Sequence, residues 1–510
     1  MKFFALSLLL ATADASIRSS TSRRLSFELI AGYSPRSQVT DHNAIDLDQA
    51  AMELSLSDGT AQSFQVAREI YEQGGFSKSF AQVILSQPLS RTVSKGTQIT
   101  GLGQNGQVVL GKAIGDFLPG SEIIRIQYKT SDIQADYVGC QVGAVFERDL
   151  AKDTSSSMVG CFAAGGQLSI EGSPERYNYT YNVFEDNDNA RTIQGFSTGA
   201  KDKMYDCATC PYSDYEKFVE YYGAFDYADQ WVLAAFASKN TDFKRGNANF
   251  AQYGFTGRAE AIKKGTVYMN IMMYVIREFE DALDDCKAKC INCNDDPVHA
   301  WDEGVAFYTG SLEGQDGVNS GKLYHALADK RCQNFKTCGT QGSEVTGISK
   351  LNYDLLSEFG RGQQELLVGN CDAARVSKER IAELIFVPVV QGSLRYAYIT
   401  DKEIATAGEK AEAEGAVFAA AVLPVVHACN AKDAEIIYDN LAVGSGKADF
   451  AAVKKAFERN YKCMGITCED IGGLWDSTQN KYMPGASPCK ASNKKETNGL
   501  AIGLGVSAGL

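Results

Sequence analysis

The second half of the chain carries the pattern that most limits its fold: apolar residues recur every three or four positions from about residue 213 to about residue 465. This period matches one turn of an α-helix. Polar residues between them make the segments amphipathic rather than uniformly apolar, as helices that pack in a bundle require. The pattern predicts a helical domain over residues 206–470, with helices near 253–287, 322–330, 351–367, 378–394 and 402–430.

Two other patterns precede the helical domain. Apolar residues spaced three and four positions apart between about residues 43 and 85 predict a helical hairpin over residues 43–94. Short runs bounded by glycine predict an antiparallel β-rich unit over residues 95–205, with strands near 107–110, 123–128, 137–143 and 177–184. The expected fold class is α+β: a β-rich antiparallel unit followed by a larger, disulfide-linked helical domain with repeated helical hairpins.

Both ends of the chain resemble targeting segments. Lys2, an apolar run and the small residues Ala13 and Ala15 predict a signal peptide over residues 1–15. Residues 16–42 are interpreted as a flexible N-terminal segment, with a transit peptide as the alternative. Residues 471–510 form a C-terminal tail whose apolar end is either the start of a membrane anchor or a frayed terminus. We therefore expect a secreted, periplasmic or cell-surface protein, with membrane association through the C-terminus and endosomal trafficking left open.

Fourteen cysteines, an even number, follow the predicted signal peptide. In an oxidising compartment such a count predicts disulfide bonds. The alternative is a zinc site that uses cysteines 207, 210, 286, 290 and 293. The sequon at Asn178 is compatible with a glycoprotein. Closeness in the sequence favours the pairs Cys207/Cys210, Cys332/Cys338 and Cys463/Cys468. In the β-rich unit we expect Cys140 to pair with Cys161.

Charge and histidine content exclude several functions. A net charge of -13 argues against a nucleic-acid partner, because phosphate binding requires clustered lysine and arginine. The four histidines, His42, His299, His325 and His427, are too few for a histidine-rich metal site or a supported Ser–His triad. His299 can nevertheless share a helix face with Asp302 and Glu303.

A tyrosine- and acid-rich phrase recurs near helix ends, with versions at residues 67–75, 220–231, 302–311 and 434–440. Phenolate and carboxylate oxygens are ligands that a hard cation such as ferric iron prefers. Arg191 and Arg258 are candidates to hold a companion anion. The alternative is structural, with the tyrosines filling helix interfaces and the acids facing solvent. The candidate metal ligands are Tyr222, Asp226, Tyr227, Asp229, Asp302, Glu303 and Tyr308.

These phrases resemble the low-iron-inducible periplasmic protein family of algae, whose relatives are the phytotransferrins. The matching stretches are residues 76–81, 137–143, 159–161, 191–198, 222–229 and 301–314. The resemblance implies an extracytoplasmic protein that captures ferric iron with carbonate as a synergistic anion. It also implies delivery to a membrane transporter or the endocytic machinery, without catalysis.

Two other functions compete with iron capture. A cell-surface structural or adhesion protein would use the repeats as a scaffold and the tyrosines as core. A secreted hydrolase would need a nucleophile–base pair or a carboxylate dyad, and neither stands out in the sequence. Iron binding in high-affinity iron acquisition is therefore the first hypothesis.

Overall fold

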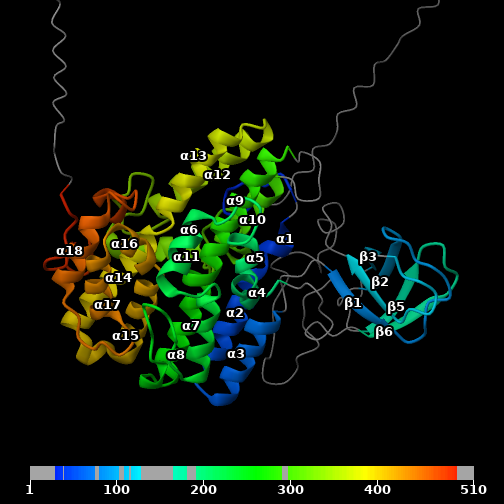
Figure 1. The fold of residues 1–510 in the computed structure, drawn as a ribbon, viewed down its shortest axis with the longest axis horizontal. Helices are drawn as coiled ribbons and strands as arrows, with labels where there is room; N and C mark the ends of the chain where they lie inside the picture. Colours follow the sequence, from blue (N-terminus) through cyan, green and yellow to red (C-terminus); the bar gives the residue numbers. More distant parts are fainter. Residues whose placement is uncertain are drawn as a thin grey trace, which may run out of the picture.

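A computed structural model describes residues 29–37, 39–74, 80–102, 108–113, 116–127, 165–180, 191–289 and 297–490. The chain has the predicted α+β class: an antiparallel barrel occurs before a larger helical region (Figure 1). The predicted signal peptide, the apolar C-terminal end, Cys140, Cys161 and the strand expected at 137–143 lie outside the described residues.

Three helices and six strands make up the N-terminal part of the described chain. The helices are α1 (Thr40–Asn43), α2 (Ile45–Leu56) and α3 (Ala61–Gln73). The strands are β1 (Phe80–Leu85), β2 (Gln98–Leu102), β3 (Val108–Ala113), β4 (Ile123–Gln127), β5 (Gly165–Ile170) and β6 (Arg176–Thr180). They close in the order β1-β4-β3-β2-β5-β6, because β1 pairs antiparallel with both β4 and β6.

The first strand corrects part of the helical hairpin predicted over residues 43–94, because residues 80–85 form β1 rather than a helix. Val83 and Leu85 are buried, whereas Ile84 between them is 40% exposed. That alternation is the period of a strand with one face toward a core. The run is too short for its period to be read reliably from sequence, and pairing with β4 determines its structure.

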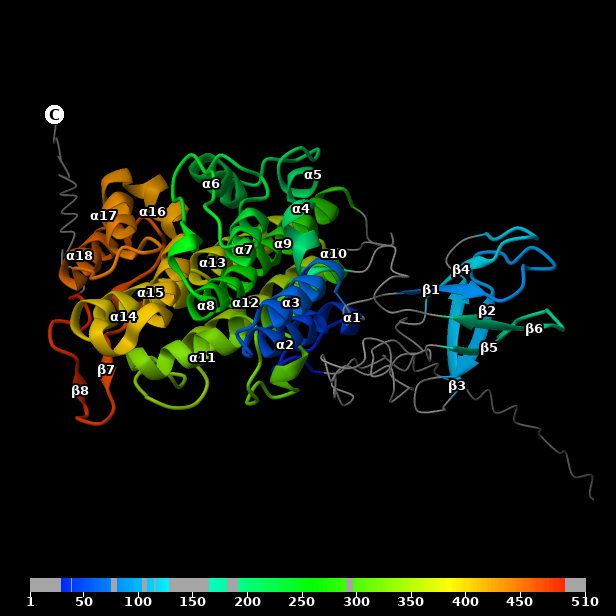
Figure 2. The same ribbon diagram turned by 90° about the horizontal axis from the view of Figure 1, so that it is seen from below.

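The helical region is built from α4 to α19 and a short terminal hairpin. Its first helices are α4 (Ile193–Thr198), α5 (Ala200–Met204), α6 (Ser213–Tyr222), α7 (Tyr227–Ala237), η3 (Phe250–Gln252), α8 (Phe255–Gly265), the π-helical turn η4 (Thr266–Ile271), α9 (Met272–Lys287) and α10 (Pro297–Thr309). The later elements are η5 (Ser311–Glu313), α11 (Tyr324–Phe335), α12 (Lys350–Leu367), α13 (Cys371–Leu384), α14 (Val387–Lys402), α15 (Ile404–Ala420), α16 (Leu423–Cys429), α17 (Ala431–Leu441), α18 (Phe450–Asn460), α19 (Cys468–Ile471), β7 (Trp475–Asp476) and β8 (Lys481–Tyr482). Figure 2 shows α14 to α18 at one end of this body and α1 with α10 toward the other.

The repeated hairpins are present in part. Helix α6 ends at Gly223, which adopts φ 74°, and α7 begins four residues later. Helices α17 and α18 form a similar pair. The copy at 67–75 is different, because α3 is followed by the barrel rather than by a second helix.

Disulfide bonds fasten the helical region. Predicted pairs Cys207–Cys210 and Cys332–Cys338 are confirmed. The pair Cys463/Cys468 is wrong, because the α17–α18 hairpin returns the chain to the end of α16. The longer-range bonds are Cys286–Cys371, Cys429–Cys463 and Cys468–Cys489. The cysteines proposed for a zinc site at 207, 210 and 286 are thus used in disulfides.

Within the described residues, no single helix has the length and apolar character of a membrane span. Residues 405–420 and 423–429 together pass that test of length and composition, but they are bent by 48° relative to each other.

A buried ion network joins α6, α9 and α13. Lys378 is 1% exposed, and its Nζ lies 3.0 Å from Asp214 Oδ2 and 2.5 Å from Glu280 Oε1. Burial opposes charge on Lys378, but the two carboxylates raise its pKa overall. Burial likewise disfavours the charged form of Asp214, while Lys378 and Lys217 lower its pKa overall. Lys217 also pairs with Asp214 and Arg375 with Glu280, and Lys378 is the buried amine that both carboxylates share.

We predict that Lys378→Met lowers the free energy of unfolding by about 3 kcal/mol at pH 7, because it leaves two buried carboxylates short of a partner. Urea denaturation with the disulfides intact measures the change. The exposed Lys432 of α17 gives the control Lys432→Met, which should change the free energy by less than about 0.5 kcal/mol. The lowered pKa of Asp214 contributes to the free energy of unfolding at pH values above about 3.9, the pKa of an aspartate in the unfolded chain. This contribution is lost as the pH falls below that value. A difference that does not shrink below about pH 4 would contradict this account.

Candidate metal centre

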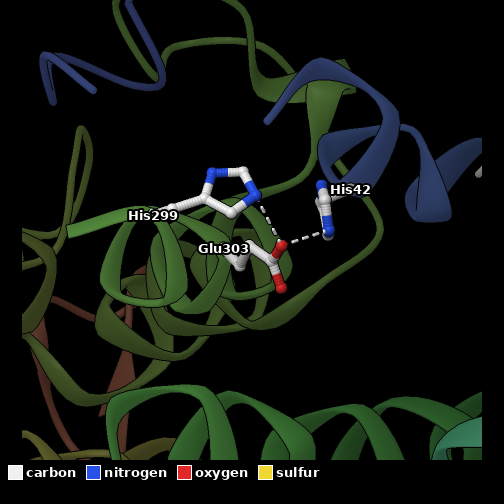
Figure 3. A group of neighbouring side chains, drawn as sticks. All are labelled: His42, His299 and Glu303. Carbon is white, nitrogen blue, oxygen red and sulfur yellow. Dashed lines mark ion pairs between the residues drawn. The ribbon is translucent and has the colours of Figure 1, made fainter. Parts of the chain in front are cut away.

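Three side chains from two helices form a cluster in which two imidazoles converge on one carboxylate oxygen (Figure 3). His42 comes from α1, and His299 and Glu303 come from α10. Glu303 Oε1 lies 2.6 Å from His42 Nε2 and 3.0 Å from His299 Nε2. Among the described residues, these form the one group of three or more histidine, cysteine or acidic donors that lies close enough together to hold a metal ion.

The spacing of α10 places its two donors. Residues four apart lie on the same face of a helix, so His299 and Glu303 project together. The next residue, Gly304, packs against Phe279 of α9, where an added Cβ would lie 2.8 Å from the ring. Gly362 of α12 accommodates Trp301 in the same way, with only 2.0 Å to the indole. These two glycines let α9 and α12 approach α10 closely and hold its orientation.

Asp302 positions the third donor indirectly. Its buried carboxylate accepts hydrogen bonds from Tyr33 Oη at 2.5 Å, from the backbone N–H of Arg36 at 2.7 Å and from Ser37 Oγ at 2.8 Å. Gln363 donates to it from α12. Residues 29–37 were expected to be flexible, but this carboxylate holds their end against α10. Asp302 therefore anchors the segment that leads into α1 and His42.

Burial, charge and access make the cluster suitable for a cation. Burial disfavours ionised Glu303, but the charge of His42 and the contacts with both imidazoles lower its pKa well below the usual value. His42 is 4% exposed, whereas His299 is 23% exposed, so the cluster is reached from the His299 side. The ring of Phe307 lies 5.5 Å from that of His42 and supports it.

The separations suit one coordinated ion. Metal–nitrogen and metal–oxygen bonds of about 2.1 Å at right angles place two donor atoms about 3 Å apart. The same distances allow charge-assisted hydrogen bonds when no ion is bound. Two imidazoles and one carboxylate leave coordination positions open, as in mononuclear non-haem iron sites.

The phenol groups predicted as ligands do not join this cluster. Tyr222 Oη donates to the carbonyl oxygen of Ala420 at 2.7 Å, and Tyr227 Oη donates to that of Met269 at 3.2 Å. Tyr308 Oη donates to Asn352 Oδ1 at 2.7 Å. Burial raises the pKa of all three phenols well above the ordinary value, which opposes tyrosinate formation. They pack in the core as protonated donors.

The remaining predicted acids are also divided among separate contacts. Asp226 accepts from Gln230 within α7, at 2.7 Å. Asp229 accepts from Tyr71 of α3 at 2.9 Å and from Gln194 of α4 at 3.1 Å. The expected single site is therefore corrected: of the seven predicted residues only Glu303 belongs to the triad, and Asp302 supports it by holding the segment that leads to His42.

His42 was missed as a ligand because it was placed in the flexible segment, far from α10 in sequence. The useful signal was His299 four residues before Glu303, an arrangement typical of two donors on one helix face. Of the two anion-binding candidates, Arg258 donates to the carbonyl oxygens of Ala235 and Phe236 at the end of α7. The other candidate, Arg191, lies just before α4.

No protein-family model, curated protein or solved structure matches this chain.

We predict that Tyr222→Phe and Tyr308→Phe leave metal affinity unchanged, because both hydroxyls already donate hydrogen bonds within the core. Each substitution should lower the free energy of unfolding by about 1 kcal/mol, since it leaves a buried acceptor unsatisfied. Metal titration and urea denaturation of the same preparations measure the two effects. An iron charge-transfer band that disappears in either variant would instead assign a tyrosinate ligand.

Proposed function

We propose that the protein binds iron through His42, His299 and Glu303 and serves in iron acquisition outside the cytoplasm. The observation that carries the proposal is the convergence of two imidazole nitrogens on Glu303 Oε1, at 2.6 and 3.0 Å. The partial exposure of His299 supports loading and release better than a fully enclosed site would. The resemblance to algal iron-assimilation proteins supports iron as the cargo.

The two imidazoles and one carboxylate bear on the oxidation state of the iron and on the other ligands that it needs. Imidazole suits several transition metals, and a two-histidine, one-carboxylate set is typical of ferrous sites with open positions. Ferric iron, the form implied by the resemblance, favours additional hard oxygen ligands. Water or carbonate would supply these in the proposal. Arg277 pairs with Glu278 at 2.6 Å, and Glu278 is one of the groups on which the charge of Glu303 acts. Burial lowers the pKa of Lys203, while the charge of Glu303 acts in the opposite direction.

The chemistry of the rest of the chain is consistent with an extracytoplasmic location. Five disulfide bonds connect described cysteines, and disulfides persist mainly in oxidising compartments. The sequon residue Asn178 is exposed on β6, so a glycan there would not enter the barrel core. Delivery of iron to a membrane transporter or the endocytic machinery belongs to the same proposal.

A cell-surface scaffold without a metal is the second candidate. The observation in its favour is that Tyr222, Tyr227 and Tyr308 are core residues with hydrogen-bonded hydroxyls. In that case His42, His299 and Glu303 form only an ion cluster between α1 and α10. Metal content of protein purified without chelators distinguishes the two functions.

Iron titration of triad variants tests the proposal. Apo-protein is titrated anaerobically with ferrous iron, and separately with ferric nitrilotriacetate in bicarbonate buffer. His42→Ala, His299→Ala and Glu303→Gln should each weaken binding by at least about tenfold, since each removes one of three protein ligands. His427→Ala on α16 is the matched control and should bind normally. Equal binding by all four variants, or no iron binding by the wild type, would reject the proposal.

Iron binding should also weaken at acidic pH, because protons compete with the metal for imidazole nitrogen. Affinity is expected to be steady near pH 7.5 and to fall below about pH 6. Competition titrations at fixed ionic strength measure this change. A site built from carboxylates alone would retain its affinity to about pH 5, and that result would argue against imidazole ligands.

A further inference from the structure

A cavity of about 260 Å³ lies between α2, α8, η4, α11, α14 and α15, on elements that do not contribute to the His42–His299–Glu303 cluster. Its lining is locally basic although the whole chain has a net charge of -13. Three glutamates line it: Glu53, Glu260 and Glu414. Six basic residues also line it: Lys263, Lys264, Lys322, Lys330, Arg331 and Lys410.

Arg331 is the central group. It comes from α11, is 2% exposed, and lies with its guanidinium 5.6 Å from the ring of Phe418. Its Nε and Nη1 are buried without a hydrogen-bond acceptor, and within the described part of the chain no carboxylate forms an ion pair with it. A buried charge that lacks a partner is unfavourable. An anion in the cavity would therefore be stabilising, because it would pair with the buried guanidinium.

Two neighbouring lysines of the cavity are already paired with glutamates. Lys264 is already held between Glu260 and Glu414, at 2.8 Å from the latter. Lys322 pairs with Glu53 at 3.2 Å. Lys330 lacks such a pair among the described residues, and burial followed by the charge of Arg331 lowers its pKa. Arg331 and Lys330 are therefore adjacent cations that carry no matching acid.

A π-helical turn forms part of the wall of the cavity. Thr266–Ile271 form a π-helical turn between α8 and α9, and Val267 and Tyr268 of this turn line the space. Such turns interrupt α-helices frequently at functional sites. Tyr268 stacks on Phe418 with ring centroids 4.9 Å apart, which fixes the aromatic side of the cavity.

We propose that this cavity binds a small organic anion with two or more negative charges, a polycarboxylate or a phosphate monoester, and that Arg331 grips one of its oxyanion groups. The guanidinium fork matches carboxylate and phosphate oxygens in a bidentate manner. The cavity has a volume of about 260 Å³. That is more than a lone carbonate or phosphate ion requires. The proposal is independent of iron binding at the triad.

Calorimetric titration of the metal-free full chain tests this site. The probes are succinate, glucose 6-phosphate and inorganic phosphate, and glucose is the uncharged counterpart of its phosphate ester. We expect binding of succinate, glucose 6-phosphate or both, no binding of glucose, and weaker affinity at higher salt. Binding of succinate alone identifies a carboxylate site, and binding of glucose 6-phosphate alone identifies a phosphate-ester site. Absence of binding by both, or equal binding of glucose, would overturn the proposal.

Two variants separate ligand binding from a structural role. Arg331→Gln should reduce affinity at least tenfold, and Lys330→Gln should reduce it about threefold, whereas Lys432→Gln on α17 should have no effect. The thermal midpoint of ligand-free Arg331→Gln should equal or exceed that of the wild type, because the substitution removes an unpaired buried charge. Retained affinity in Arg331→Gln would contradict the assignment, whether or not that variant is less stable.

Discussion

Close packing of α10 between α9 and α12 is the constraint on which the candidate metal centre depends. Gly304 lies against Phe279, and Gly362 lies against Trp301, at separations that leave no room for a Cβ. Trp301 Nε1 also donates to the carbonyl oxygen of Phe359, so the orientation of α10 is fixed by packing and by a buried hydrogen bond. Its two consecutive acids then contact different partners: Asp302 holds residues 33–37, and Glu303 faces the two imidazoles.

This arrangement explains why the tyrosine- and acid-rich phrases do not come together in one cluster. A tyrosine near a helix end can serve as a metal ligand or as an amphipathic core residue, and the two roles require the same residue types. What separates them is whether the hydroxyl has a backbone acceptor, as Tyr222 has in Ala420. That acceptor lies 198 residues away, so no local pattern could reveal it.

The fold was predictable where one period persisted over many residues. The helical domain, the antiparallel character of the β unit and two local disulfides followed from patterns within single segments. The barrel closure did not, because β1 is a six-residue apolar run whose partners, β4 and β6, lie about 40 and 95 residues away. Cys429–Cys463 and the approach of His42 to α10 failed to emerge for the same reason: long-range packing determines both.

The proposed iron ligands are imidazole and carboxylate groups rather than phenolates. X-ray absorption at the iron edge of the reconstituted wild-type protein tests this proposal most directly, because outer-shell scattering from an imidazole ring distinguishes it from other ligands. The account predicts two imidazoles and a carboxylate oxygen at about 2.1 Å from the iron. A first shell of oxygen alone, with no imidazole scattering and a phenolate charge-transfer band, would contradict it.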